Sequence, residues 1–173
     1  MKYHIEFNEK SNAIDCLERA FEYIQRVKKD PKLWKWVVIS LFSSLYGFAI
    51  CSIQGTNSKN VCEGKKGKLI GFKTALERCQ NSERGKKKLS LTDTQSWAIN
   101  KLHEEFRNNF QHFKPMLWAI NIKGFPGIAN DVLDVIRFLA LNVSNSRGLS
   151  VSAERKVKSL VFQSKEVLKS IKY

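Results

Sequence analysis

Apolar residues recur at steps of three and four along most of the chain, which is the periodicity of amphipathic helices. In the first such stretch, residues 11–28, they are Ile14, Leu17, Phe21 and Ile24. The two stretches nearest the C-terminus contain Ile128, Val132, Val135, Ile136 and Leu139, and then Val157, Leu160, Val161, Leu168 and Ile171. Nothing reads clearly as a sheet and no repeat is visible. The pattern predicts an all-α fold.

A nearly uniform apolar run predicts the central helix of the core. Asp30 and Pro31 combine a residue that favours the N-cap with one that favours the first helical position. The helix is expected to run from Pro31 to about Ile53 and to stop at Gly55. Its most apolar part, Val37 to Cys51, is shorter than the roughly 20 residues needed to span a bilayer. We therefore expect a buried helix.

Two basic segments separate the middle helices. Residues 55–68 are rich in Gly, Asn, Ser and Lys without periodicity, which predicts an exposed loop. Residues 81–90 form the second basic segment, and a short helix is expected between Ile70 and Cys79. The two segments form one positive surface only if they lie on the same side of the molecule, which the sequence leaves open.

The helix after these loops has clear start and stop signals. Thr92 and Gln95 have the spacing of a capping box. The apolar stripe that follows consists of Ile99, Leu102, Phe106, Phe110 and Phe113. Pro115 disfavours helical geometry at the preceding residue, so the helix is expected to end near His112 or Phe113.

Length and composition indicate one domain. With 173 residues, 43% of them hydrophobic, the chain has enough apolar material for a real core. We expect a single domain over residues 1–173, a helical bundle of about five or six helices. The four tryptophans are not clustered and are expected in the core or at an interface; they are Trp34, Trp36, Trp97 and Trp118.

Several kinds of site and location are disfavoured. The four cysteines lack C-x-x-C spacing and a nearby His cluster, so we expect reduced thiols and no zinc site. No P-loop, H-E-x-x-H or G-x-S-x-G motif occurs, so no metal or cofactor is expected. The N-terminus lacks an apolar run of signal-peptide length, which predicts a cytoplasmic protein.

The charge favours an anionic partner. Lys and Arg number 30 against 16 Asp and Glu, a net charge of +14. Such a balance is typical of proteins that bind nucleic acid or a membrane surface. No basic amphipathic helix with a broad exposed apolar face is evident, so RNA is favoured over a membrane. A simpler interpretation of the excess lysine is that it keeps the protein soluble.

The segment FRNNFQHFKP, residues 106–115, contains the candidate catalytic residues Arg107, Asn108 and His112. A straight helix advances about 100° per residue, so Arg107 and His112 lie roughly 140° apart, whereas Asn108 and His112 share a face. A contact between Arg107 and His112 then requires unwinding before Pro115, or two copies of the motif that meet across a dimer.

This segment resembles the HEPN domains, small all-helical proteins marked by an R-x(4–6)-H motif in which a polar residue usually follows the arginine. Arg107, Asn108 and His112 match the form with a four-residue gap. The sequence of residues 106–141 looks like bacterial HEPN-like proteins beyond the motif itself. The apolar segment ISLFSSLYGFAI, residues 39–50, is similar to their second core helix.

The resemblance implies a metal-independent endoribonuclease that dimerises to bring two motifs together. Many members are toxins or antiviral defence effectors, which would add an antitoxin or regulatory partner. The residue types suit this chemistry, because His112 can act as base or acid near neutral pH and Arg107 presents a permanent charge to phosphate. Asn108 is expected to orient the phosphate or to hold the His112 ring.

Other residues near the motif receive weaker roles. The basic side chains expected to hold the RNA backbone by charge are Lys114, Lys86, Lys87 and Lys88. His103 lies one turn before Arg107 and could reach the same pocket, but a solvated surface histidine is the favoured interpretation. Glu104 and Glu105 are expected on a solvated helix face.

Two alternatives to catalysis stay open. In the first, Arg107 caps carbonyl groups at the helix end while His112 packs beside Pro115. In the second, the chain is a non-catalytic HEPN-like module that binds RNA or a nucleotide, or serves as a dimerisation partner. Members of that type often lack the arginine or the histidine, and both are present here.

Overall fold

The computed structural model describes residues 3–55, 57–64, 66–81, 87–112, 117–142 and 148–173. Its α-helices and one π-helical segment are α1 (Glu9–Ile24), α2 (Trp34–Gln54), α3 (Phe72–Asn81), α4 (Asp93–Asn100), η3 (Lys101–Arg107), α5 (Asn108–Gln111), α6 (Phe125–Leu141) and α7 (Val151–Lys169). Since α4, η3 and α5 follow one another without a break, they form one continuous helix. The all-α bundle expected from the sequence is confirmed.

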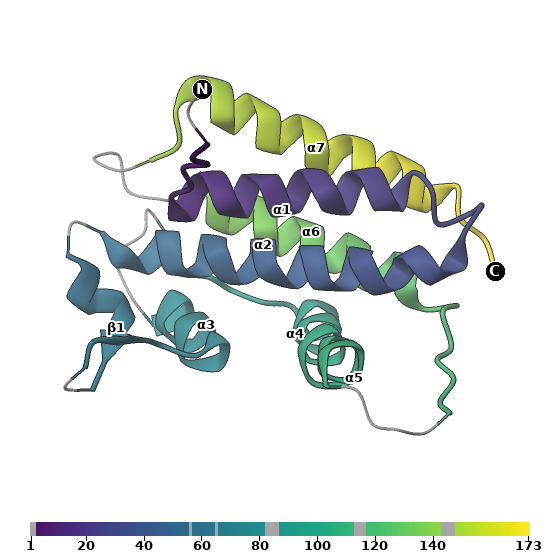
Figure 1. Cartoon of the computed structure of the whole chain (residues 1–173), viewed down its shortest axis with the longest axis horizontal. Coiled ribbons are helices and arrows are strands. Elements are labelled where there is room, and N and C mark those ends of the chain that lie inside the picture. Colours follow the sequence, from purple (N-terminus) through teal and green to yellow (C-terminus); the bar gives the residue numbers. More distant parts are fainter. Residues whose placement is uncertain (1–2, 56, 65, 82–86, 113–116, 143–147) are drawn as a thin grey trace.

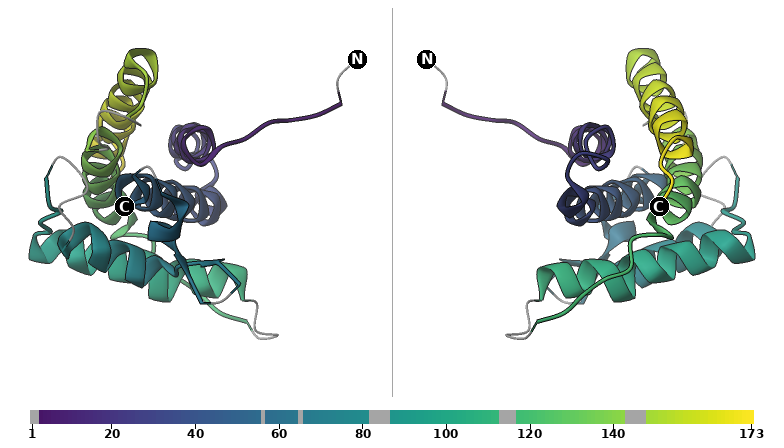
Figure 2. Two further views of the ribbon diagram at one scale, coloured as in Figure 1. Left: turned by 90° about the vertical axis from the view of Figure 1, so that its left-hand side faces the viewer. Right: turned by 90° about the vertical axis from the view of Figure 1, so that its right-hand side faces the viewer.

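Helix α2 is the centre of the bundle. It contacts α1, α3, η3 and α6, while α7 packs on α1 and α6. In Figure 1, α1 and α7 lie on one side of α2, and α3 and the α4–α5 run lie on the other. The segment before α1 extends away from the helices in Figure 2. The continuous helix formed by α4, η3 and α5 carries the motif, and we call it the motif helix. It packs on the side of α2 opposite α1 and α7.

The start and end of α2 follow the sequence signals. Asp30 accepts a hydrogen bond at its side chain from the Lys32 backbone, and the 3-10 turn η1 (Pro31–Leu33) leads into the helix. Gly55 ends it with a φ of +57°, a left-handed conformation that favours glycine. The buried side chains of α2 include Leu41, which is fully enclosed. The expected buried core helix is confirmed.

The length argument used for this helix was wrong. The apolar helical segment Pro31–Gln54 has 24 residues, and the mean hydropathy of its most apolar 18 residues is 1.9, so its length and composition are enough to cross a membrane. The length of the apolar helix was underestimated from Val37 to Cys51 alone, because the helix continues beyond both of these residues. Within the fold, 67% of its most apolar window is buried, as is usual for the core helix of a bundle.

A small β-hairpin interrupts the loop between α2 and α3. The strands β1 (Cys62–Glu63) and β2 (Lys68–Leu69) pair antiparallel, after a 3-10 turn, η2 (Ser58–Val61). Val61 and Ile70 are buried beneath them. An exposed loop without strands was expected here, because strands of two residues are too short to show alternation of polar and apolar positions.

Cysteines and tryptophans divide between core and surface. The cysteines are free thiols, and burial raises the pKa of Cys51 and Cys79 to about 12. Trp34 is buried and donates from Nε1 to the Tyr173 hydroxyl over 2.7 Å. The other three tryptophans are exposed, so a core position is wrong for them: Trp36, Trp97 and Trp118.

Candidate active site

The helix that carries the motif contains a π-helical segment. Both hydrogen bonds of the Thr92–Gln95 capping box are present at its start. Within η3 the backbone hydrogen bonds join residues five positions apart, which defines a π-helix, a feature often found at functional sites. The helix ends at Gln111, and the His112 backbone N–H donates to the Asn108 carbonyl over 2.8 Å. The expected position of the helix end is confirmed.

The inward stripe of this helix sets the direction of the motif. Leu102 and Phe106 are buried and Phe110 is half-buried, as the spacing predicted. Phe113, the last expected member, lies outside the described residues. Because these side chains face the core, Arg107 lies at the edge of the stripe, beside α2.

Arg107 is held by two neighbours. Its Nη1 donates to Oδ1 of Asn108 over 2.9 Å, and its guanidinium carbon lies 5.0 Å from the centre of the Phe42 ring. Its Nε is buried and has no hydrogen-bond partner among the described residues. A buried donor without a partner costs about 1–3 kcal/mol. The Nε donor is therefore unused, and an acceptor such as a phosphate oxygen would reach it only after a neighbouring side chain moves.

His103 is half-buried, and the expectation of a solvated surface histidine is wrong. Its side chain is 17% exposed. The ring stacks on Phe42 at 5.2 Å between centres, with 7° between the planes, and lies 5.0 Å from the Phe72 ring. These two phenylalanines belong to α2 and α3, so periodicity within the motif helix could not reveal them. His103 does reach the same pocket as Arg107.

A carboxylate orients the His103 ring. Its Nδ1 lies 3.1 Å from Oε1 of Glu104, which also accepts from Lys73 over 2.7 Å. Burial lowers the pKa of His103, the nearby charges of Arg107 and Lys73 lower it further, and Glu104 opposes the shift. The hydrogen bond from Lys73 lowers the pKa of Glu104. Neutral His103 thus sits beside an ionised carboxylate.

His103 and Arg107 line a cavity of about 510 Å³ between α1, α2, α3 and the motif helix. We call it the Arg107 cavity. Its aromatic walls are Phe42, Tyr46 and Phe72. These walls are the part of the site that sequence reasoning missed, since they belong to α2 and α3 and not to the helix that carries the motif.

The motif residues do not all meet within one chain. Asn108 is half-buried and binds Arg107, whereas a phosphate or the His112 ring was expected from the sequence as its partner. His112 is exposed and is not among the residues that line the Arg107 cavity. This agrees with the wide angle between Arg107 and His112 expected on a helix.

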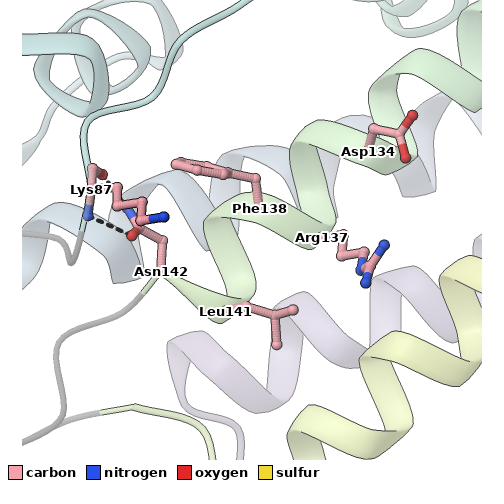
Figure 3. Close-up of a pocket in the computed structure, with 6 residues that line it drawn as sticks. All are labelled: Lys87, Asp134, Arg137, Phe138, Leu141 and Asn142. Atoms are coloured by element: carbon pink, nitrogen blue, oxygen red, sulfur yellow. Dashed lines mark hydrogen bonds between the residues drawn. The ribbon is translucent and has the colours of Figure 1, made fainter.

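The candidate RNA-binding lysines are only partly described. Lys86 and Lys114 lie outside the described residues. Lys87 and Lys88 are exposed, and the Lys87 N–H donates to Oδ1 of Asn142 over 2.7 Å. Lys87 lines a different cavity of about 410 Å³, with Asp134 and Arg137 of α6 (Figure 3). Lys87 and Lys88 therefore lie at the start of the segment leading to α4, and Lys87 lines this cavity and not the Arg107 cavity.

The acidic residues near the motif have their own partners. Glu104 pairs with Lys73, and Glu105 pairs with Lys101 one turn earlier on the same helix. Both carboxylates are exposed, as expected. No group of three or more His, Cys, Asp or Glu that could hold a metal occurs within the described ranges.

An apolar surface lies on the other side of the motif helix. Asn109 and Phe110 line a cavity of about 580 Å³ together with Trp34 and Trp118. Leu117 is 99% exposed, and Trp118 beside it is also exposed.

Comparison with known proteins found no matching family model, no matching curated protein and no matching solved structure.

Proposed function

We propose that the protein is a metal-independent endoribonuclease of the HEPN type, with Arg107, Asn108 and His112 at a site shared by two chains. One observation carries the proposal: the Arg107 guanidinium is fixed by Asn108 and Phe42 but keeps a hydrogen-bonding edge unused. His112, five residues later, is exposed at the end of the same helix. A fixed cation and an accessible titratable group are what phosphodiester cleavage without metal requires.

The chemistry assigns one role to each group. Arg107 holds the non-bridging oxygens of the phosphate and stabilises the charge of the phosphorane. One histidine takes the proton of the ribose 2′-hydroxyl, and the 2′-oxygen bonds to phosphorus as the bond to the 5′-oxygen breaks. A second histidine gives its proton to that leaving oxygen. The products are a 2′,3′-cyclic phosphate and a 5′-hydroxyl.

Two copies of the chain supply the two histidines. His103 lines the Arg107 cavity, and His112 is not among the described residues that line it. The exposed apolar side chains of Leu117 and Trp118 directly after the motif support a homodimer, because a second copy would remove them from water. The shared site would then form next to this surface.

The remaining parts of the proposal follow from charge and from the resemblance. A net charge of +14 favours RNA as the partner. A toxin or antiviral defence role and an antitoxin or regulatory partner follow from the HEPN resemblance, and the proposed location is the cytoplasm. The proposed site uses no metal and no cofactor.

The decisive experiment is RNA cleavage by purified protein in the presence of EDTA. We expect the wild-type chain to cut total cellular RNA and a tRNA pool, and to leave 5′-hydroxyl ends. Arg107→Ala and His112→Ala should both lose cleavage while remaining folded. His4→Ala is the matched control, since His4 is exposed and lies outside the motif.

A second candidate function is supported by a different observation. Arg107 faces an aromatic cavity that does not contain His112, which suits a module that binds RNA or a nucleotide without cutting it. The same experiment separates the two functions. RNA binding without cleavage, or cleavage that persists equally in both motif variants, would reject the nuclease.

A further inference from the structure

The Arg107 cavity has the size and walls of a small-molecule site. Its volume of about 510 Å³ falls within the usual range of ligand pockets. The Phe42 and Phe72 rings lie 5.0 Å apart, and the Tyr46 ring meets Phe72 edge-on at 6.0 Å. Phe42 and Phe72 are buried and already contact His103, so the half-buried ring of Tyr46 is the aromatic wall that a flat heterocycle can contact.

Polar side chains with unused hydrogen-bonding capacity lie around these walls. Asn12 of α1 and Gln111 of α5 both line the cavity and are exposed. Their side-chain amides carry donors and acceptors together, as the edges of nucleobases do. Ser43 adds a hydroxyl from α2. The cavity can thus contact both the face and the edge of a base.

Arg107 adds a cation at one wall. Its Nη1 is occupied by Asn108, while the buried Nε has no partner among the described residues. A phosphate oxygen at this edge would satisfy the donor and balance the charge. An aromatic pocket beside a free arginine edge matches a base and the phosphate joined to it.

We propose that the Arg107 cavity binds one unstacked base of RNA, with the adjoining phosphate at the Nε edge of Arg107. The inference rests on the proposed function, because the same arginine holds the phosphate to be cut. It adds a source of specificity: the base that fits the cavity selects the phosphodiester bond that reaches Arg107. The preference for particular cleavage positions in the RNA is then determined by a cavity that lies within a single protein chain.

The test is a calorimetric titration of the full chain with the four nucleoside 3′-monophosphates and with inorganic phosphate. None of these probes has a phosphodiester bond, so binding is measured apart from cleavage. Gly71→Leu is the blocking variant: Gly71 lines the cavity, and a Cβ added there meets nothing within 4 Å. Gly127→Leu is the matched control, because its Cβ is equally free and it is not among the residues lining the cavity.

We expect at least one nucleotide to bind about tenfold or more tightly than inorganic phosphate, since stacking a base adds affinity. Gly71→Leu should remove most of that gain, and Gly127→Leu should retain it. Asn12→Ala, at an exposed position, is the second variant if Gly71→Leu does not fold, and it should also weaken nucleotide binding.

Two results would overturn the cavity assignment. One is nucleotide affinity no greater than that of inorganic phosphate. The other is nucleotide affinity that neither variant changes. Nucleotide binding in a protein that does not cut RNA supports the cavity and rejects the nuclease. RNA cleavage without nucleotide binding rejects the cavity and supports the nuclease.

Discussion

Arg107 donates a hydrogen bond from Nη1 to Oδ1 of Asn108 over 2.9 Å, so the side chains of two consecutive motif residues are joined. Asn108 thereby restricts the direction of the guanidinium, which also rests over Phe42. This relationship makes Asn108 a positioning residue for Arg107. Substitutions of Asn108 therefore change the surroundings and the direction of the Arg107 guanidinium without removing the arginine.

Asn108→Asp should weaken RNA binding. The aspartate keeps an acceptor for Arg107, but its negative charge cancels the cation that would face a phosphate. We expect the slope of log affinity against log salt concentration to fall by about one, as for the loss of one phosphate contact. Fluorescence anisotropy with 2′-O-methyl RNA, which cannot be cut by 2′-hydroxyl attack, measures this. An unchanged slope in both Asn108→Asp and Arg107→Ala would contradict a phosphate contact at Arg107.

The pH dependence of stability should contain a contribution from His103. Burial against Phe42 and Phe72 lowers its pKa in the folded chain, so the unfolded chain binds the proton more readily. This contribution is present above the ordinary histidine pKa of about 6.5 and is lost as the pH falls through the lowered pKa. Lys73 and Arg107 strengthen the effect and Glu104 opposes it.

Urea denaturation at about pH 7.5 and about pH 5 measures this contribution. We expect the free energy of unfolding to fall less between these pH values in His103→Gln than in the wild-type chain. His4→Gln should behave like the wild-type chain, because His4 is exposed. An equal fall in His103→Gln would show that other groups cause the acid sensitivity.

A side chain at Gly47 should destabilise the fold while Ala13 is present. A Cβ added at Gly47 would lie 2.8 Å from the Ala13 Cβ, where α1 and α2 pack together. Overpacking costs about 1–3 kcal/mol, and the better helix propensity of alanine returns about 1 kcal/mol. We expect Gly47→Ala to be destabilising by on the order of 1 kcal/mol in urea denaturation.

Ala13→Gly combined with Gly47→Ala should recover part of this loss, because it removes the conflicting methyl group. Gly71→Ala is the control, since its Cβ meets nothing within 4 Å. Additive effects of Ala13→Gly and Gly47→Ala would mean that the two positions do not touch.

Leu117→Glu should separate dimerisation from nucleotide binding. Leu117 is 99% exposed beside the motif, and a carboxylate there would oppose an apolar contact between two copies. We expect a smaller mass in analytical ultracentrifugation and loss of RNA cleavage, with nucleotide binding unchanged. Phe162→Glu, which adds the same charge at an exposed apolar position on α7, is the control. A dimer that persists in Leu117→Glu would place the interface elsewhere.

Local signals were enough to predict the helices. Asp30 with Pro31 and Thr92 with Gln95 mark two helix starts that the structure shows, because capping depends on residues only a few positions apart. Ile128 was the first apolar residue recognised in the next stretch, but α6 begins at Phe125, since Pro126 suits the first turn of a helix.

The surroundings of the candidate site could not be predicted in the same way. His103 stacks on Phe42, which lies more than sixty positions away in the sequence, and no periodicity within either helix encodes that contact. The hydrogen bond between Arg107 and Asn108 also depends on side-chain rotamers that spacing does not specify. The sequence could name the motif residues, but the partners of Arg107 came from tertiary packing.

The π-helical segment Lys101–Arg107 has a further consequence for how such motifs are compared between proteins. Deleting one residue from a helix turns everything beyond it by about 100° relative to what precedes it. A homologue lacking one residue between Lys101 and Phe106 would keep the same residues from Arg107 to His112, yet its arginine would no longer point toward Phe42. In two chains with identical motifs, the motif side chains can therefore face different neighbours. A one-residue gap in their alignment, about one turn before the arginine, would distinguish two such chains.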